Sequence, residues 1–237
     1  MLGLFEQNRC LICYEVMDSS IGWRDLFLPE KETHLCQNCQ AKLQPIKGET
    51  CEICGRPFNL LDPQFRSGNQ CNDCIRWEID PTYKGVLTQN HSLYIYNDFL
   101  KEVIAKYKYR GDYILAKLFA EDIKNKIKEL KPDAIVPIPL SEQRLLERGF
   151  NQSEALITEA GYKQTHLLTR IHSEKQSKKS RTERIHLPQV FQTTQSISGK
   201  ILIIDDIYTT GSTLRHAAQA LKLAGTISIH SLTIARG

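Results

Sequence analysis

The 237-residue sequence lacks the features that would carry a chain into or across a membrane. It has no run of about 18 consecutive apolar residues, which excludes a helix that spans the bilayer. Its first ten residues, MLGLFEQNRC, lack the apolar core of a secretory signal peptide. We therefore expect a cytoplasmic protein without a transmembrane segment, in a reducing compartment where disulfides do not persist.

A strong compositional bias is also absent. Hydrophobic residues make up 41% of the chain and charged residues 24%, which excludes the disordered and fibrous classes. Residues 1–84 hold 9 basic against 12 acidic residues and residues 85–237 hold 22 against 15, so their net charges are −3 and +7. A basic C-terminal part suits phosphate-rich ligands, including nucleic acids, but does not select among them.

All eight cysteines lie in Cys-x-x-Cys pairs: Cys10/Cys13, Cys36/Cys39, Cys51/Cys54 and Cys71/Cys74. Two such pairs complete a tetrahedral Cys₄ site without an open position, so we predict two structural Zn²⁺ ions. Sequential pairing closes two short loops, whereas interleaved pairing stays open as an alternative. A disulfide framework does not suit a reducing compartment, and redox-active pairs typically occur singly.

The cysteines define a small N-terminal module. We place it at residues 1–84, with Glu78–Gly85 as the linker because this stretch contains Pro81 and Gly85. Residues 85–237 are then a second, larger domain. In it, Asn97 or Asp98 is expected to cap a first helix, Gly111 to end it, and Asp112 to cap a second helix that runs toward Pro132.

The stretch Ile201–Thr213 reads ILIIDDIYTTGST. Its four aliphatic residues predict a strand buried on both faces, as in a parallel sheet, and residues 214–223 have helical spacing. Asp205 and Asp206 end the strand, where carboxylates can hold sugar hydroxyls or a hydrated Mg²⁺. Backbone N–H groups and hydroxyls of the loop after the strand can converge on a phosphate; this loop comprises Thr209, Thr210, Gly211, Ser212 and Thr213. The alternative is an ordinary buried strand followed by a capped helix, without a ligand.

This order of strand, acidic pair and hydroxyl loop resembles the phosphoribosyl pyrophosphate (PRPP) motif of type I phosphoribosyltransferases. A second buried strand is predicted over Asp133–Pro139, which ends in two prolines. In phosphoribosyltransferases the loop after the first core strand holds the pyrophosphate. The resemblance assigns Arg144 and Arg148 to that role, for which guanidinium groups are suited, and the alternative is exposed charge on a helix.

Two basic clusters suit single-stranded nucleic acid. In the first, basic residues alternate with tyrosines, a combination that meets both phosphates and bases; we assign Lys108 and Arg110 to it. The second lies in the polar segment 163–186, where we assign Lys178, Lys179 and Arg181. The alternatives are a solvated helix end for the first cluster, and for the second a loop that closes over PRPP or a charge run without a ligand.

The motifs VPIPL, Arg148–Gln152 (RGFNQ) and ILIIDDIYTTGST follow a double cysteine module, and in this order they closely resemble the ComF family. The resemblance implies an α/β fold, with a type I phosphoribosyltransferase-like parallel sheet flanked by helices and a small N-terminal zinc-ribbon-like module. It also implies a competence protein that assists uptake of single-stranded DNA into the cytoplasm. A DNA-translocating ATPase is the expected partner, which would bring the protein to the inner face of the membrane.

Three functional hypotheses remain open on the sequence. The first is a DNA-uptake protein whose domain binds PRPP, a similar sugar phosphate or single-stranded DNA. The second is an active phosphoribosyltransferase of nucleotide salvage, in which Asp205 and Asp206 are catalytic and Mg²⁺ accompanies PRPP. No acceptor site is evident, so turnover is left undecided. The third treats the zinc module as an adaptor for the translocating ATPase.

Overall fold

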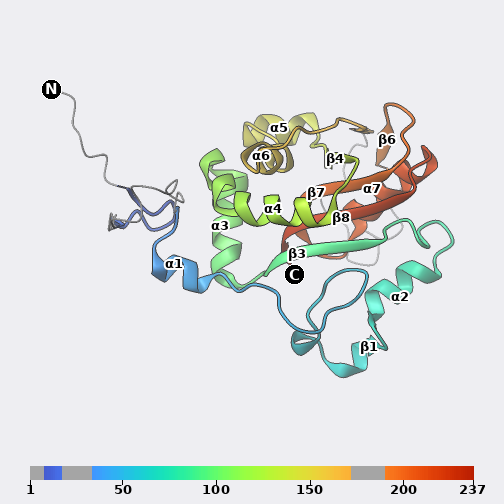
Figure 1. Ribbon diagram of the computed structural model, residues 1–237, viewed down its shortest axis with the longest axis horizontal. Coiled ribbons are helices and arrows are strands. Elements are labelled where there is room, and N and C mark those ends of the chain that lie inside the picture. The colour runs from blue at the N-terminus through green and yellow to red at the C-terminus, as the bar shows by residue number, and fades with distance from the viewer. Residues whose placement is uncertain (1–7, 18–33, 172–189) are drawn as a thin grey trace.

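A four-stranded parallel sheet forms the centre of the computed structural model, which describes residues 8–17, 34–171 and 190–237 (Figure 1). Its strands stand in the order β3 (Gln89–Ile95), β8 (Ser228–Arg236), β7 (Lys200–Tyr208) and β4 (Ala134–Pro137). Each neighbouring pair runs parallel. The predicted parallel α/β sheet is confirmed.

Alternating residues of β7 serve the two faces of the sheet. Ile201 and Ile203 pack in one core with α7 (Ser212–Leu223), while Leu202 and Ile204 pack in a second core. All four are at most 1% exposed, and burial of each aliphatic side chain is worth about 2 kcal/mol. The second core is built with α3 (Asp98–Tyr109), α4 (Lys117–Leu130) and α6 (Gln152–Glu159), on the face opposite α7 (Figure 1).

The predicted helix caps are correct for α3 and wrong for α4. Asn97 caps α3, because its Oδ1 accepts the N–H of Leu100 at 2.9 Å. Gly111 follows with a φ of 70°, and Asp112 opens a 3₁₀ turn over Tyr113–Ala116 instead of the predicted α-helix. This turn places two apolar side chains in the second core before α4 begins at Lys117. The apolar spacing that suggested one helix therefore spans two elements.

The cysteine-bearing segment folds into short elements at two separate places. Helix α1 (Gln37–Lys42) lies near α3, whereas β1 (Arg66–Ser67), β2 (Gln70–Cys71) and α2 (Asn72–Ile79) lie beyond the other end of β3 (Figure 1). The chain between them runs along β3, with Ile46 N donating to Leu93 O at 3.0 Å. It covers an edge of the sheet that would otherwise expose unpaired backbone groups.

Short elements complete the described chain. Helix α5 (Glu142–Arg148) follows β4, and β5 (Leu168–Arg170) pairs antiparallel with β6 (Phe191–Thr193) outside the main sheet. Two further 3₁₀ turns cover Phe58–Leu60 and Pro63–Phe65. No helix in the described ranges combines the length and apolarity that a bilayer crossing requires.

The segment predicted as a linker and the residue before it pack against α7. Trp77 and Tyr83 are buried, and they share the first core with Leu214 and Ala217 of α7. Tyr83 Oη also lies 2.9 Å from Nδ1 of His216 on α7. The second half of the cysteine module and the sheet thus have one continuous core, and a boundary between residues 84 and 85 stays a prediction.

Candidate functional site

The carboxyl ends of β4 and β7 form one edge of the sheet, the place where open parallel sheets bind ligands. Asp205 and Asp206 lie there, among the last four residues of β7. Asp206 forms an ion pair with Lys108, whose Nζ lies 2.8 Å from Oδ1, and the two side chains are 10% and 16% exposed. The backbone N–H of Asp206 donates to Oδ1 of Asp205 at 2.9 Å. Lys108, assigned from the sequence to nucleic acid, is therefore a partner of the acidic pair.

Asp205 has an unusual electrostatic environment. Burial and the neighbouring charge of Asp206 raise the pKa of Asp205 to about 7, against the opposing effects of Lys108 and Arg148. A carboxyl group with this pKa gains or loses its proton near neutral pH. A bound cation would favour its ionised form, because an opposite charge nearby lowers a carboxyl pKa. The acidic pair is therefore prepared for a ligand that brings positive charge or hydroxyl donors.

Arginines approach the acidic pair from two further elements. Arg148 is the last residue of α5 and donates from Nη1 to Oε1 of Gln152 at 2.8 Å. Its positive charge opposes the rise in the pKa of Asp205. Arg144 lies on the exposed face of the same helix. Arg170 of β5 lies close enough for burial and the charge of Arg144 to lower its pKa, while Asp205 raises it. Arg148 and Arg170 thus interact electrostatically with Asp205, and Arg144 interacts with Arg170; the sequence did not indicate Arg170.

The hydroxyl loop connects β7 to α7 beside the acidic pair. Gly211 is its essential residue, because its φ is 81° and a Cβ there would overlap the ring of Tyr208. Ser212 N donates to Oγ1 of Thr210 at 3.4 Å, and α7 begins at Ser212. The first N–H groups of a helix have no partner inside it, so this end offers donors to an anion.

Two side chains that sequence analysis did not single out hold the backbone of this loop. Trp77 Nε1 donates to the carbonyl of Thr210 at 3.0 Å. Arg236 Nη1 donates to the carbonyls of Tyr208 at 3.2 Å and Thr209 at 3.1 Å. Trp77 lies 133 positions from Thr210 and Arg236 lies 27 positions from Thr209, so no local pattern could have indicated them.

The eight cysteines form two tetrads, each with its ligand atoms within 4.8 Å of one another. The first contains Cys10, Cys13, Cys36 and Cys39, and the second contains Cys51, Cys54, Cys71 and Cys74. The sequential pairing is therefore the one that the structure supports. All eight are free thiols, and four converging sulfurs form the donor set that structural zinc takes.

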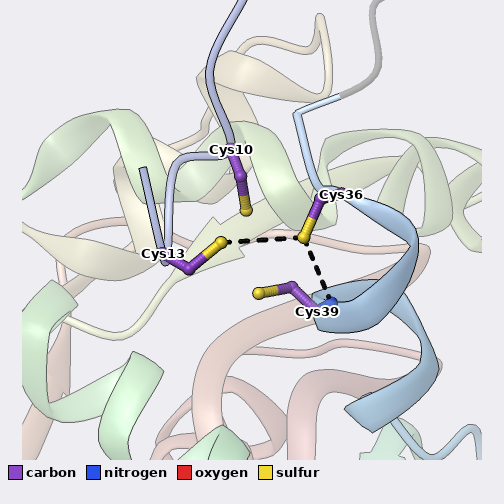
Figure 2. A group of neighbouring side chains, drawn as sticks. All are labelled: Cys10, Cys13, Cys36 and Cys39. Carbon is purple, nitrogen blue, oxygen red and sulfur yellow. Dashed lines mark hydrogen bonds between the residues drawn. The ribbon is translucent and has the colours of Figure 1, made fainter. Parts of the chain in front are cut away.

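In the first tetrad the side chains point toward a common centre (Figure 2). Cys13 Sγ lies 3.6 Å from Cys36 Sγ, and the N–H of Cys39 donates to Cys36 Sγ at 3.5 Å (Figure 2). Cys13 is exposed, so water reaches this centre. Lys106 Nζ donates to the carbonyl of Ile12 at 3.4 Å, which ties the tetrad to α3.

The second tetrad is buried, and each of its cysteines is at most 1% exposed. Cys54 Sγ lies 3.6 Å from Cys71 Sγ, and the N–H of Cys71 donates to Cys51 Sγ at 3.4 Å. Gly55 has a φ of 69°, and a Cβ there would lie 3.0 Å from the carbonyl of Asn90. Glycine is therefore required for this turn to approach β3.

The remaining nucleic-acid assignments stay predictions. Arg110 is an exposed residue at the C-terminal cap of α3, next to Tyr109, whose side chain is 73% exposed. Lys178, Lys179 and Arg181 lie outside the described residues.

Comparisons with known proteins match two parts of the chain to two domain families. Residues 4–75 match the double zinc ribbon domain family, and residues 112–237 match the phosphoribosyl transferase domain family. Competence protein ComFC of Bacillus subtilis is 38% identical over 233 residues, covering 96% of this chain and 94% of that protein. Competence protein ComFC of Streptococcus pneumoniae is 32% identical over 231 residues, covering 96% and 100%.

A third relative matches only in part. The DNA utilization protein YhgH of Salmonella typhi is 30% identical over 113 residues, which cover 44% of this chain and 50% of that protein. The two ComFC matches, in contrast, run through the cysteine tetrads and the acidic site alike. The chain therefore belongs to the ComF family.

Proposed function

We propose that this protein assists the uptake of single-stranded DNA into the cytoplasm during natural transformation. The observation that carries the proposal is the match to two proteins named competence protein ComFC along nearly the whole chain, including the acidic site. Reduced cysteine tetrads suit the cytoplasm, where thiols stay available to zinc. Deletion of the gene is expected to lower transformation frequency sharply, and an unchanged frequency would refute the proposal.

The ligand of the acidic site is PRPP or a similar sugar phosphate. Asp205 and Asp206 would hold the ribose hydroxyls, and the loop Thr209–Thr213 would hold the 5-phosphate. Arg144, Arg148 and Arg170 supply the positive charge that a diphosphate needs. Mg²⁺, if it accompanies the ligand, would neutralise the diphosphate and be held by the acidic pair through water.

Single-stranded DNA would lie on the exposed end of α3 next to this site. Tyr109 exposes its ring there for base stacking, and the guanidinium of Arg148 lies 5.7 Å from the centre of that ring. Arg110 adds a phosphate contact, whereas Lys108 is engaged with Asp206. The cluster around Lys178, Lys179 and Arg181 is proposed to extend the basic surface.

The partner of the protein is a DNA-translocating ATPase, and the zinc-ribbon module is the part that docks it. The first tetrad is the more accessible half of this module, since the second is buried in the core with α7. Replacement of Cys13 and Cys36 by serine should abolish capture of the ATPase, while Asp206→Ala should leave capture unchanged. Capture that survives the cysteine replacements but is lost in Asp206→Ala would refute the adaptor role.

Turnover of PRPP in nucleotide salvage is the second candidate function. It is favoured by the combination of an acidic pair with three arginines and a hydroxyl loop, which would surround a diphosphate leaving group. Its test is pyrophosphate release from Mg²⁺–PRPP in the presence of each common purine or pyrimidine base. Release that depends on one base would establish the enzyme, and binding without release would leave a PRPP-binding protein.

A further inference from the structure

Two arginine side chains donate hydrogen bonds to sulfurs of the buried cysteine tetrad. Arg236 of β8 donates from Nη2 to Cys54 Sγ at 3.4 Å, and Arg215 of α7 donates from Nη2 to Cys74 Sγ at 4.0 Å. The arginines are 4% and 0% exposed. Both belong to the phosphoribosyltransferase-type part of the chain, although the sulfurs belong to the zinc ribbon.

The arginines offset the negative charge that the tetrad carries when zinc is bound. Four thiolates and one Zn²⁺ carry a net charge of −2, and a buried charge is costly unless it is paired. Two guanidinium groups supply positive charge at the sulfurs, and that of Arg215 is shared with Glu78, whose Oε1 lies 2.9 Å from its Nη1. The residues therefore fit a zinc ion with four thiolate ligands.

The same guanidinium group of Arg236 also reaches the phosphate loop. Its Nη1 donates to the carbonyls of Tyr208 and Thr209, and to the main-chain oxygen of Gly237. The centre of the Tyr208 ring lies 4.8 Å from this guanidinium. Trp77, three residues after Cys74 on α2, holds the next carbonyl in sequence, that of Thr210. Three consecutive carbonyls are thus bound by side chains attached to, or in contact with, the tetrad.

Fixing these carbonyls also fixes the N–H groups that follow them. In a trans peptide unit the C=O and N–H bonds point in opposite directions, and the described chain has no cis peptide bond. Because the carbonyl of Thr209 points to Arg236 and that of Thr210 to Trp77, the N–H groups of Thr210 and Gly211 point away from these two side chains. The tetrad therefore orients donors that a phosphate in the loop would use.

We propose that the buried tetrad positions the loop Thr209–Thr213 for its phosphate ligand, and that Arg236 is the positioning residue that couples the two. The proposal rests on the assignment of this loop to phosphate made above. It assigns the two zinc centres different roles, since the second supports ligand binding while the first, near α1, does not contact the loop within the described residues.

The test uses Arg236→Lys in the full-length, zinc-loaded protein. Lysine keeps the positive charge but cannot reach a sulfur and two carbonyls together. We expect two zinc ions per chain to remain, amide hydrogen exchange in residues 208–213 to accelerate, and affinity for Mg²⁺–PRPP to fall about tenfold. Trp77→Phe removes the bond to Thr210 and keeps an aromatic ring against Tyr83 and Arg215. It should produce the same changes more weakly, so it serves if Arg236→Lys does not fold.

Arg215→Gln is the matched control. It removes the other arginine, which contacts Cys74, Glu78 and the ring of Trp77 but whose side chain binds no loop carbonyl. With zinc loaded, its exchange rates in residues 208–213 and its PRPP affinity should equal those of the wild type. Cys36→Ser should lose one zinc ion and likewise leave the loop unchanged.

The outcomes separate this proposal from the assignment on which it rests. Unchanged exchange in residues 208–213 for both Arg236→Lys and Trp77→Phe would overturn it, as would equal acceleration in Arg215→Gln or Cys36→Ser. If wild-type protein bound no PRPP, the assigned ligand would be wrong. Faster exchange confined to the two loop-contact variants would then still establish that the tetrad positions the loop.

Discussion

Removal of the Lys108 ammonium group should expose how strongly the acidic pair depends on it. Lys108→Met keeps most of the aliphatic side chain but deletes the charge 2.8 Å from Oδ1 of Asp206. Removing one partner of a surface ion pair costs less than about 1 kcal/mol of stability, and removing one partner of a buried pair costs about 3–5 kcal/mol. This pair is mostly buried, so we expect a cost between these two values. We expect a loss of about 2 kcal/mol in the free energy of unfolding at pH 7.5.

A double-mutant cycle isolates this pair from other effects of the substitution. Guanidinium chloride unfolding of Lys108→Met, Asp206→Asn and the double variant, all zinc-loaded, should give a coupling energy of about 1–2 kcal/mol. Lys101→Met, an exposed lysine on the same helix, is the matched control and should change stability by less than about 0.5 kcal/mol. A coupling energy below about 0.5 kcal/mol would refute the assignment of Lys108 as the partner of Asp206.

Three further predictions concern pH, the loop and the metal centres. Because the pKa of Asp205 is raised, the folded chain keeps a proton between about pH 4 and 7 that the unfolded chain has released, so the free energy of unfolding falls as pH rises, by at most about 1.4 kcal/mol per pH unit. Asp205→Asn should remove this contribution to the slope. An identical slope in the variant would contradict the prediction. Gly211→Ala should lower PRPP affinity more than tenfold with zinc content unchanged, because the methyl group overlaps the Tyr208 ring, and wild-type affinity by titration would disprove that steric account. A chelator should release zinc in two phases, and Cys13→Ser should abolish the faster one, since only the first centre is open to water; a single phase would contradict this.

A fifth prediction separates the two roles assigned from the sequence to the basic end of α3. Arg110→Gln should reduce the salt dependence of single-stranded DNA binding, with a slope smaller by about 0.7, because one fewer phosphate is neutralised. Lys108→Met should leave that slope unchanged, since its charge is engaged by Asp206. The slope is measured by fluorescence anisotropy at several salt concentrations. An equal reduction of the slope in both variants would show that Lys108 contacts DNA as well.

Local patterns predicted the parts of the fold that local chemistry determines. The strand Ile201–Ile204 is buried on both faces as expected, because four consecutive aliphatic residues suit the interior of a parallel sheet. The Cys-x-x-Cys spacing predicted both tetrads for a similar reason, since one tight turn presents two sulfurs to one ion. Asn97 was recognisable as a cap, whereas the 3₁₀ turn after Asp112 was not, because its apolar spacing is compatible with either helix.

Contacts between distant segments could not be predicted in this way. Lys108 looked like part of a basic surface, and only the packing of α3 beside β7 brings it to Asp206. Arg236 and Trp77 carry no local signature, because their roles depend on carbonyls of a loop far away in the sequence. The shared core of the second tetrad and α7 likewise depends on contacts between segments far apart in the sequence, which no local pattern indicates.

The claim that the acidic pair and the hydroxyl loop hold a sugar phosphate is tested most directly by calorimetric titration of Mg²⁺–PRPP into zinc-loaded protein. The wild type should bind one molecule per chain. The variant Asp205→Asn/Asp206→Asn should bind at least tenfold more weakly with both zinc ions retained. Wild-type protein without a binding isotherm, or equal affinity in the double variant, would contradict the account.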